Sequence, residues 1–386
     1  MAESIIQKSF RFRIFPSKTQ TTKLVNTLDL CRNLYNAALQ ERRDAYRLNR
    51  ISISYYDQAN QLKEIKETNS EYKDVHSQVS QDVLKRVDKA FQAFFRRIKS
   101  KKEKAGFPRF QGKHRYNSFT FAQSGFSLTN SRLTLSKIGK IKIKLHRAIV
   151  GKVKTLTITR DSCGKWFACF SVETAKEILE PTSQQVGIDA GLAIYAKFSD
   201  ETEIENPRFF RKSEKRLAMA QRRLSAQVKG SKERHQKRKI VAKIHNKIKN
   251  QRSNFTHQLS RFLVNNYDLI VFEKLQMLNM VKNHCLAKSI SDASWGQLIE
   301  QVRYKAENAG RTLIQINPAY TSQTCRICGY CEKANRKTQA VFECVKCYHT
   351  ENADLNAAKN ILRIGLDSLG IQSLEATSKR FGLVVE

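Results

Sequence analysis

Four cysteines near the end of the chain have the spacing of zinc ligands. Cys325 and Cys328 form one Cys-x-x-Cys pair, Cys344 and Cys347 form a second, and 15 residues (329–343) separate the pairs. Each short pair can aim two thiolates at one ion, and a tetrahedral site needs four such ligands. Because four thiolates leave no coordination position open, we predict a structural zinc rather than a catalytic one.

Three acidic residues stand where apolar segments end or helical patterns begin. Asp189 closes one apolar stretch, Glu273 closes another, and Asp354 opens an Ala- and Leu-rich helical pattern shortly after the last cysteine. A carboxylate in apolar surroundings costs roughly several kcal/mol to desolvate unless a cation or hydrogen-bond donors meet it. For Asp189 the residues alone also allow a simpler role, the capping of a turn.

Acids at the margins of β/α units can converge at one edge of a sheet. Three clustered carboxylates repel one another unless divalent cations lie between them, and hard oxygen ligands with room for water suit Mg²⁺ or Mn²⁺. Two such ions about 4 Å apart can hold the attacking and leaving oxygens of a phosphodiester. The acids therefore predict phosphodiester hydrolysis on a polyanionic substrate.

The net charge indicates which polyanion this is. Among 386 residues, 70 are Lys or Arg and 35 are Asp or Glu, so the formal charge is +35. Such a surplus makes nucleic acid the first partner to consider. No apolar run approaches the roughly 20 residues that span a bilayer, and the N-terminus lacks the apolar core of a secretion signal. We therefore expect no membrane partner and a cytoplasmic protein.

The first half of the chain predicts an antiparallel β-domain interrupted by helices. Residues 5–15 alternate apolar and basic side chains toward their end, and residues 117–175 return to strand patterns. Helical periodicity begins at Thr19 and returns over 54–66 and 77–99. The last of these helices has an aromatic side, which is more typical of a core than of a base-stacking platform, and a basic side suited to phosphate contact.

The second half predicts strands and helices that would position the acids. Two strands are expected around Asp189, one strand over 267–273, a helix over 294–309 and a strand over 312–316. A helical pair over 208–263 carries dense charge of one sign, which favours a nucleic-acid backbone alongside it over a merely solvated face. Its candidate phosphate contacts are Arg222, Arg223, Lys237, Arg238 and Lys243.

Taken together, these motifs resemble those of the TnpB family, which is encoded by IS200/IS605-type transposons and is a compact relative of the Cas12 nucleases. The resemblance covers nearly the whole chain. The motifs that carry it are Phe10-Arg-Phe-Arg-Ile-Phe-Pro16, Asn33-Leu-Tyr-Asn-Ala-Ala38, Gly106-Phe-Pro-Arg-Phe110, Gly187-Ile-Asp189-Ala-Gly191, Val271-Phe-Glu273, Asp292-Ala-Ser-Trp-Gly-Gln297, Thr321-Ser-Gln-Thr-Cys325 through Cys347, and Asn352-Ala-Asp354-Leu-Asn-Ala-Ala358.

The resemblance implies a multidomain protein of the α+β and α/β classes. A β-barrel wedge domain would be interrupted by a helical recognition domain and followed by an RNase H-like RuvC domain with an inserted zinc module. The expected boundaries are 1–16 and 116–180 for the wedge domain, 17–115 for the recognition domain, 181–319 for the RuvC domain with its basic hairpin 208–263, 320–350 for the zinc module, 351–369 for the final RuvC helix and 370–386 for a loose tail.

The resemblance also implies an RNA-guided DNA endonuclease. Asp189, Glu273 and Asp354 would be its Mg²⁺ (or Mn²⁺) ligands, and a guide RNA from the transposon end would pair with the target strand of double-stranded DNA. Cleavage next to a short transposon-adjacent motif would support maintenance of the transposon. By local pattern, the residues that could read this motif are Tyr55, Gln78, Gln81 and Gln123, which can donate and accept at base edges but are equally well explained as ordinary surface polar residues.

The chain departs from the family pattern at a few positions. Ala190 follows the aspartate where a bulkier apolar residue is common, Cys331 adds a thiol that could compete for zinc, and Tyr348-His349 replaces a common glycine. None of these removes an acid, which disfavours a nuclease-silent, RNA-guided repressor. The acids alone also permit a transposase acting in strand transfer, but the basic surface and the zinc module favour an RNA-bound nuclease.

Overall fold

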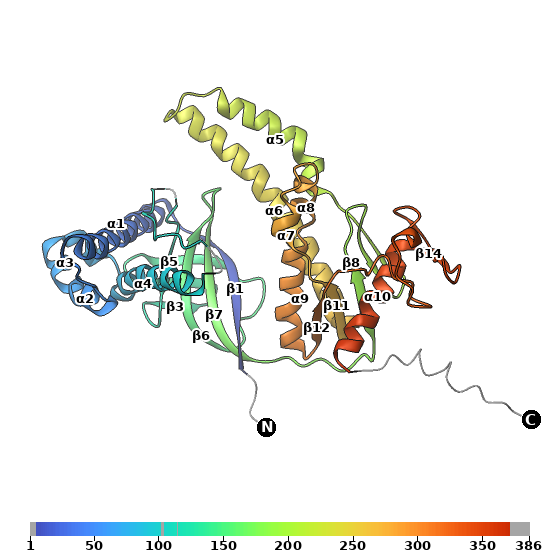
Figure 1. Ribbon diagram of the computed structural model, residues 1–386. Helices are drawn as coiled ribbons and strands as arrows, with labels where there is room; N and C mark the ends of the chain where they lie inside the picture. Colours follow the sequence, from blue (N-terminus) through green and yellow to red (C-terminus); the bar gives the residue numbers. More distant parts are fainter. Residues whose placement is uncertain (1–4, 102–103, 114, 371–386) are drawn as a thin grey trace, which may run out of the picture. The chain divides into compact units, whose positions relative to one another are not determined.

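The computed structural model describes residues 5–101, 104–113 and 115–370. The tail predicted to be loose beyond residue 370 lies outside these ranges. The chain divides into two compact units, Met1–Ala175 and Lys176–Glu386, and each is described here by itself (Figure 1). No helix in the described part of the chain combines the length and apolar character needed to cross a membrane.

The first unit is built on a seven-stranded antiparallel sheet with the order β2-β6-β7-β1-β5-β4-β3. Strand β1 pairs with β7 on one side and β5 on the other, so the first strand lies inside a sheet made otherwise of strands after residue 117. This confirms the predicted strands that flank a helical insertion. The strands are β1 (Ile5–Phe15), β2 (Ser118–Phe121), β3 (Phe126–Thr129), β4 (Arg132–Leu135), β5 (Gly139–Lys144), β6 (Lys152–Arg160) and β7 (Trp166–Ala175).

The two edge strands of this sheet follow one another in the sequence, which forces the sheet to curl. In a flat sheet, six strand spacings would separate β2 from β3 by about 29 Å. Residues 122–125, which join them, can span at most about 18 Å. The sheet therefore rolls into a near-closed barrel, and the rings of Phe121 and Phe126 from the two edges lie 6.3 Å apart. The predicted β-barrel is confirmed in this form.

The helical insertion between β1 and β2 shares one hydrophobic core with the barrel. Ser17 caps the first helix by accepting a hydrogen bond from the Gln20 amide while the Gln20 side chain accepts from Ser17, a capping box. The helices expected from Thr19 onward and near 54–66 and 77–99 are confirmed. The insertion consists of α1 (Lys18–Asn49), α2 (Tyr55–Asn60), α3 (Leu62–Thr68), the 3₁₀-helix η1 (Ser70–Asp74) and α4 (Ser77–Ser100).

The second unit is built on a five-stranded sheet with the order β10-β9-β8-β11-β12. Strand β9 is antiparallel to β8 and β10, whereas β11 runs parallel to both β8 and β12. An antiparallel meander extended by two parallel strands is the RNase H-like arrangement that the family resemblance implied. The strands are β8 (Gln185–Asp189), β9 (Ile194–Phe198), β10 (Glu203–Glu205), β11 (Leu269–Glu273) and β12 (Thr312–Ile316).

Helices cover both faces of this sheet, which explains why β11 is apolar throughout. Ile270 and Phe272 belong to a core formed with α6 and α9, whereas Leu269 and Val271 pack in a separate core with α10. This alternation is the two-residue period of a strand. The helices of the unit are α5 (Phe209–Ser225), α6 (Lys232–Asn266), α7 (Met277–Met280), α8 (Ala287–Ala293), α9 (Trp295–Ala309) and α10 (Ala353–Ser368), and the segment before α10 holds η2 (Lys333–Asn335), β13 (Val341–Glu343) and β14 (Thr350–Asn352).

Two glycines let α10 approach the sheet closely. A Cβ added to Gly187 on β8 would lie 2.3 Å from the Ala358 carbonyl oxygen, and one added to Gly365 on α10 would lie 2.6 Å from a methyl carbon of Val271. Both distances are far below van der Waals contact, so only glycine fits at either position. The register of α10 along β8 is therefore fixed by backbone packing.

Replacement of Gly187 by alanine is expected to destabilise the second unit. The new methyl group meets backbone rather than a movable side chain, so the free energy of unfolding should fall by about 1–3 kcal/mol or more. The matched control is Gly296→Ala in α9, where an added Cβ meets nothing within 4 Å. Thermal unfolding of both variants checks this, and equal midpoints would contradict the close packing of α10.

Candidate functional site

The structure places two of the three predicted acids at the same end of neighbouring parallel strands. Asp189 ends β8 and Glu273 ends β11. Ile188 and Phe272, the residues just before them, are register partners. Asp354 lies in the first turn of α10, the helix that packs over Gly187 of β8. The arrangement follows from the fold, because carboxyl ends of parallel strands share one edge of a sheet.

The three carboxylates lie close enough for Glu273 and Asp354 to change the protonation of Asp189. The pKa of Asp189 is raised to about 7, first by burial and then by the negative charges of Glu273 and Asp354, while Arg336 opposes the shift. Burial also raises the pKa of Glu273 and of Asp354. A like charge raises a carboxyl pKa only when it is near, so the acids form one electrostatic cluster.

This cluster has the chemistry of a site for hard divalent cations. It offers only carboxylate oxygens, which Mg²⁺ and Mn²⁺ prefer. Among the described residues, its three carboxylates outnumber the one cation that contacts them. That cation is Arg336, whose Nη2 donates to Asp354 Oδ1 at 3.3 Å. Sequence reasoning did not single out Arg336, because only the folded segment between the two cysteine pairs brings it to the acids.

Hydrogen bonds hold two of the acids from outside the cluster. Glu273 Oε1 accepts from the hydroxyl of Thr321 at 2.5 Å. Asn352 caps α10 by accepting from the backbone amides of Asp354 and Leu355, both at 3.0 Å, and so fixes the turn that carries Asp354. Thr321 and Asn352 lie inside the sequence motifs described above, but the motifs do not indicate what either residue contacts.

The four predicted zinc ligands come together as one group. Their sulfur atoms all lie within 4.8 Å of one another, and the Cys325–Cys347 and Cys328–Cys344 sulfur pairs are both 3.6 Å apart. A zinc ion with Zn–S bonds of about 2.3 Å requires a tetrahedron edge of about 3.8 Å. The thiols therefore fit a structural zinc. Among the described residues they are the one such group of four, and Cys331 is not a member of it.

The three acids are spread more widely than the thiols. Among the described residues, only the four cysteines form a group of three or more Asp, Glu, His or Cys ligand atoms that all lie within 4.8 Å of one another. A wider spread is compatible with ligands divided between two ions about 4 Å apart.

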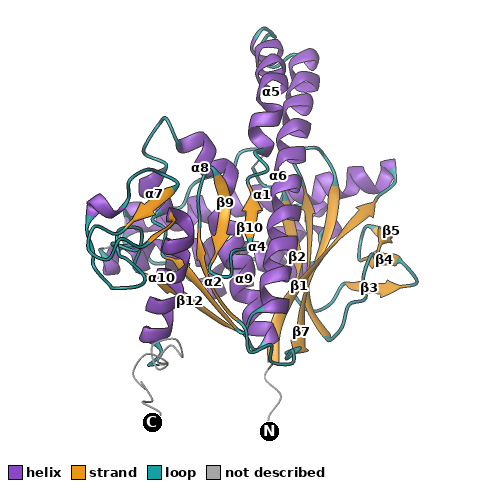
Figure 2. Ribbon diagram, turned by 90° about the vertical axis from the view of Figure 1, so that its right-hand side faces the viewer, coloured by secondary structure: helices purple, strands orange, loops and turns teal. Residues whose placement is uncertain are grey.

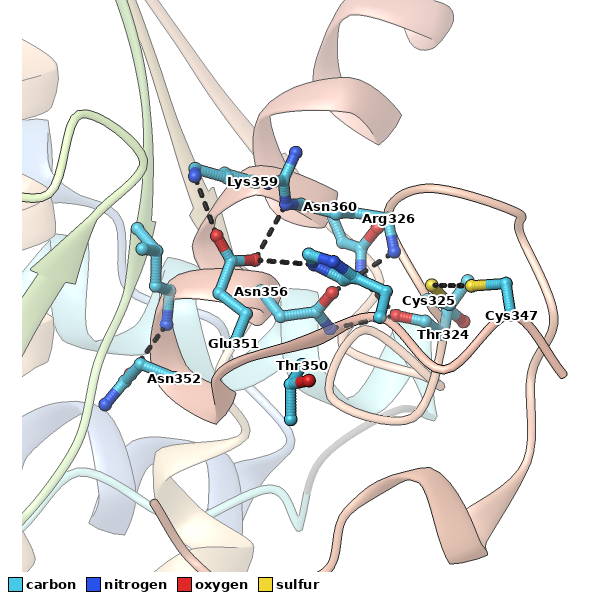
Figure 3. Close-up of polar contacts among 12 residues, drawn as sticks. Thr324, Cys325, Arg326, Cys347, Thr350, Glu351, Asn352, Asn356, Lys359 and Asn360 are labelled. Carbon is cyan, nitrogen blue, oxygen red and sulfur yellow. Dashed lines mark hydrogen bonds and ion pairs between the residues drawn. The ribbon is translucent and has the colours of Figure 1, made fainter. Parts of the chain in front are cut away.

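Buried asparagines of α10 tie the first cysteine pair to the helix (Figure 3). The Asn356 side chain accepts from the Arg326 amide at 3.1 Å and donates to the Thr324 carbonyl at 2.9 Å. Asn360 donates to Thr324 at 2.7 Å and to Thr321 at 3.0 Å. Both asparagines are fully buried. Their spacing of four residues in an Ala- and Leu-rich helix was the available sequence signal, because it places two amides on one apolar face.

A second contact between the same segments is ionic. Glu351 accepts from Arg326 at 2.7 Å and from Lys359 at 2.9 Å (Figure 3). Glu351 therefore neutralises two cations beside the first cysteine pair. Together with the asparagines, it connects residues 320–350, the zinc segment, to α10, the helix of Asp354.

The basic hairpin predicted over 208–263 is formed by α5 and α6, which run side by side in both views (Figures 1 and 2). A small core containing Leu217 and Ile248 joins them. Asp292 anchors the base, since it accepts from the Phe210 amide at 2.9 Å and from Arg252 at 2.7 Å. Among the candidate phosphate contacts, Arg222, Arg223, Arg238 and Lys243 are exposed and Lys237 is partly buried.

The four candidate motif-reading residues gather around the first half of α4. Gln78 Oε1 accepts from the backbone amides of Gln123 and Ser124 at 2.9 and 2.8 Å, so its acceptor is already used within the fold. The exposed Gln81 lies one turn away. The ring of Tyr55, which opens α2, lies 5.6 Å from Lys85 Nζ on α4. The side-chain amides of Gln81 and Gln123 are the exposed members of the set.

Loss of a cysteine from the group of four is expected to remove the zinc. Purified protein should hold about one zinc ion per chain, and Cys344→Ser should lose most of it because three thiolates and a hydroxyl make a poorer site. Metal analysis by mass spectrometry measures the content. Cys331→Ser is the matched control and should keep its zinc. Zinc loss in the control variant would show that the ligand set is a different one.

Comparison with protein families gives three matches along the chain. A model described as a probable transposase, OrfB_IS605, matches residues 168–284, and a Cas12f1-like TNB domain model matches residues 295–361. A model described as a helix-turn-helix domain matches residues 1–50, which include strand β1 and the long helix α1 in this structure.

Curated relatives match over most of their length. A putative RNA-guided DNA endonuclease, InsQ, of Escherichia coli K12 is 33% identical over 380 residues, which cover 93% of this chain and 92% of the relative. A putative RNA-guided DNA endonuclease of Streptomyces pristinaespiralis is 32% identical over 370 residues, with 94% and 90% covered.

The fold also matches a solved structure. A Cas12f1 complex with single-guide RNA and target DNA aligns with a TM-score of 0.58 at 12% identity, covering 92% of this chain and 98% of the other. The sequence motifs, the RNase H-like sheet and the relatives that match over most of their length all indicate the same family. The chain belongs to the TnpB family.

Proposed function

We propose that this protein is an RNA-guided endonuclease that cuts double-stranded DNA next to a short transposon-adjacent motif. Its guide RNA derives from the transposon end, and cleavage depends on two Mg²⁺ or Mn²⁺ ions bound by Asp189, Glu273 and Asp354. The observation that carries the proposal is the proximity of the three acids: Asp189 and Glu273 end β8 and β11, and the charges of Glu273 and Asp354 both raise the pKa of Asp189. The relatives named as RNA-guided DNA endonucleases supply the class of reaction.

The roles of the chain's own residues follow from their positions. The three carboxylates bind the ions, and a bound ion pair supplies charge neutralisation and an activated water at the phosphodiester. Arg336 interacts with both Asp189 and Asp354, so its guanidinium lies beside the place where a scissile phosphate must sit. Specificity would come mainly from pairing between guide and target, while the protein reads the flanking motif and the shape of the hybrid.

Neutralising Asp189 is expected to abolish cleavage and to leave binding intact. Asp189→Asn removes one charged ligand at nearly constant volume, so the complex with guide RNA should still bind matching DNA. The measurement is cleavage of a matched duplex in Mg²⁺ beside a binding assay on the same samples.

A second acid of the same sheet provides the control for this test. Glu205→Gln changes an exposed acid of β10 and should cut as the wild type does. If the wild type binds matched DNA but cuts it in no divalent metal, the protein is an RNA-guided binder instead of a nuclease. If it cuts without RNA, direct transposase chemistry is the better explanation.

Guide RNA binding is expected to weaken steeply as salt rises. Each neutralised phosphate makes the logarithm of the binding constant fall more steeply with the logarithm of the salt concentration, by about 0.7–0.9 in slope. The double variant Arg222→Gln, Arg223→Gln removes two exposed charges of α5, so its slope should be shallower by about 1–2. Gln221→Ala, an exposed and uncharged neighbour, should leave the slope unchanged. A flat salt dependence of the wild type would contradict a role for the hairpin in phosphate contact.

A further inference from the structure

Thr321 connects the zinc segment to Glu273. It begins the four residues that lead into Cys325, and it is only 3% exposed. Its Oγ1 lies 2.5 Å from Glu273 Oε1 and 3.1 Å from the carbonyl oxygen of Pro318. A hydroxyl has one proton, and the shorter contact with a carboxylate is the stronger bond. The proton therefore goes to Glu273, whose Oε2 has no hydrogen-bond donor among the described residues.

The hydroxyl of Thr321 is itself held in place by the zinc segment and by α10. The Thr321 carbonyl accepts from Asn360 at 3.0 Å, and the same amide group donates to Thr324, the neighbour of Cys325. Asn360 is fully buried and belongs to α10, the helix whose first turn carries Asp354. Helix α10 thus carries one acid directly and supports a second through Thr321.

We propose that Thr321 is a positioning residue that orients the carboxylate of Glu273 for divalent metal binding, and that the zinc segment acts on the nuclease site through it. The inference rests on the proposed function above. The hydroxyl occupies Oε1 and leaves Oε2 for an ion. Outer partners of metal-binding carboxylates commonly contribute roughly 10–100-fold to metal affinity or activity.

The test separates the hydroxyl from the rest of the side chain. Thr321→Val keeps the volume and removes the donor, whereas Thr321→Ser keeps the donor and removes a methyl group. Mn²⁺ binding to the full chain without nucleic acid is measured by electron paramagnetic resonance, and the binding that Asp189→Asn loses defines the site. We expect roughly 10–100-fold weaker Mn²⁺ binding for the valine variant and near wild-type binding for the serine variant.

A cleavage assay gives the second readout. With guide RNA bound, the valine variant should need a correspondingly higher Mg²⁺ concentration and should recover part of its rate at high Mg²⁺. Zinc content and the unfolding midpoint are measured for every variant. Wild-type Mn²⁺ binding by Thr321→Val would overturn the proposal, and so would equal weakness of both variants at unchanged zinc content and midpoint, because packing of the methyl group would then be the cause.

The zinc segment is tested separately with Cys344→Ser. Thr321 is intact in this variant, so weaker Mn²⁺ binding supports transmission from the zinc segment, and unchanged binding overturns it even if Thr321→Val does not fold. Failure of the proposed function gives a different result. A wild type that binds Mn²⁺ through the three acids but cuts no DNA would remove the nuclease proposal and leave the role of Thr321 in metal binding standing.

Discussion

The repulsion among three carboxylates at one sheet edge is the constraint on which the second unit depends. Burial and like charge raise the pKa of Asp189 to about 7, and the surrounding structure holds the acids near one another against this repulsion. Parallel pairing of β8 with β11 fixes two of them, and glycine contacts lock the helix of the third against the sheet. The fold is thus organised to hold an arrangement that favours a cation.

The zinc segment supports this arrangement, because Thr321 contacts Glu273 and Arg336 contacts Asp354. Four thiols fix its two turns, buried Asn356 and Asn360 tie the first turn to α10, and Glu351 adds an ionic contact with Arg326. Asn356 pairs both its amide oxygen and its amide nitrogen, whereas Asn360 donates to two backbone carbonyls and its Oδ1 has no partner among the described residues. A structural zinc would in this way stabilise the geometry of the proposed nuclease site.

Much of this was predictable from local patterns. Strand alternation, helix periodicity and the two Cys-x-x-Cys pairs depend on neighbours in sequence, and an acid that closes an apolar run marks the end of a strand. The curl of the first sheet was implied by the family resemblance, but its cause is visible only once β2 and β3 are known to be the two edges. Thr321, Arg336 and Asn360 act through contacts with residues 18 to 48 positions away, and a single sequence does not specify such pairs.

In the barrel of the first unit, a short covalent connection limits how far the two edge strands can separate. Its edges β2 and β3 are not neighbours in the strand order, and residues 122–125 hold them near each other as a tether. The length of this connection therefore sets how far the barrel can open. Gln78 of α4 accepts hydrogen bonds from the backbone amides of Gln123 and Ser124, so a helix of the insertion also holds the connection that limits how far the barrel can open.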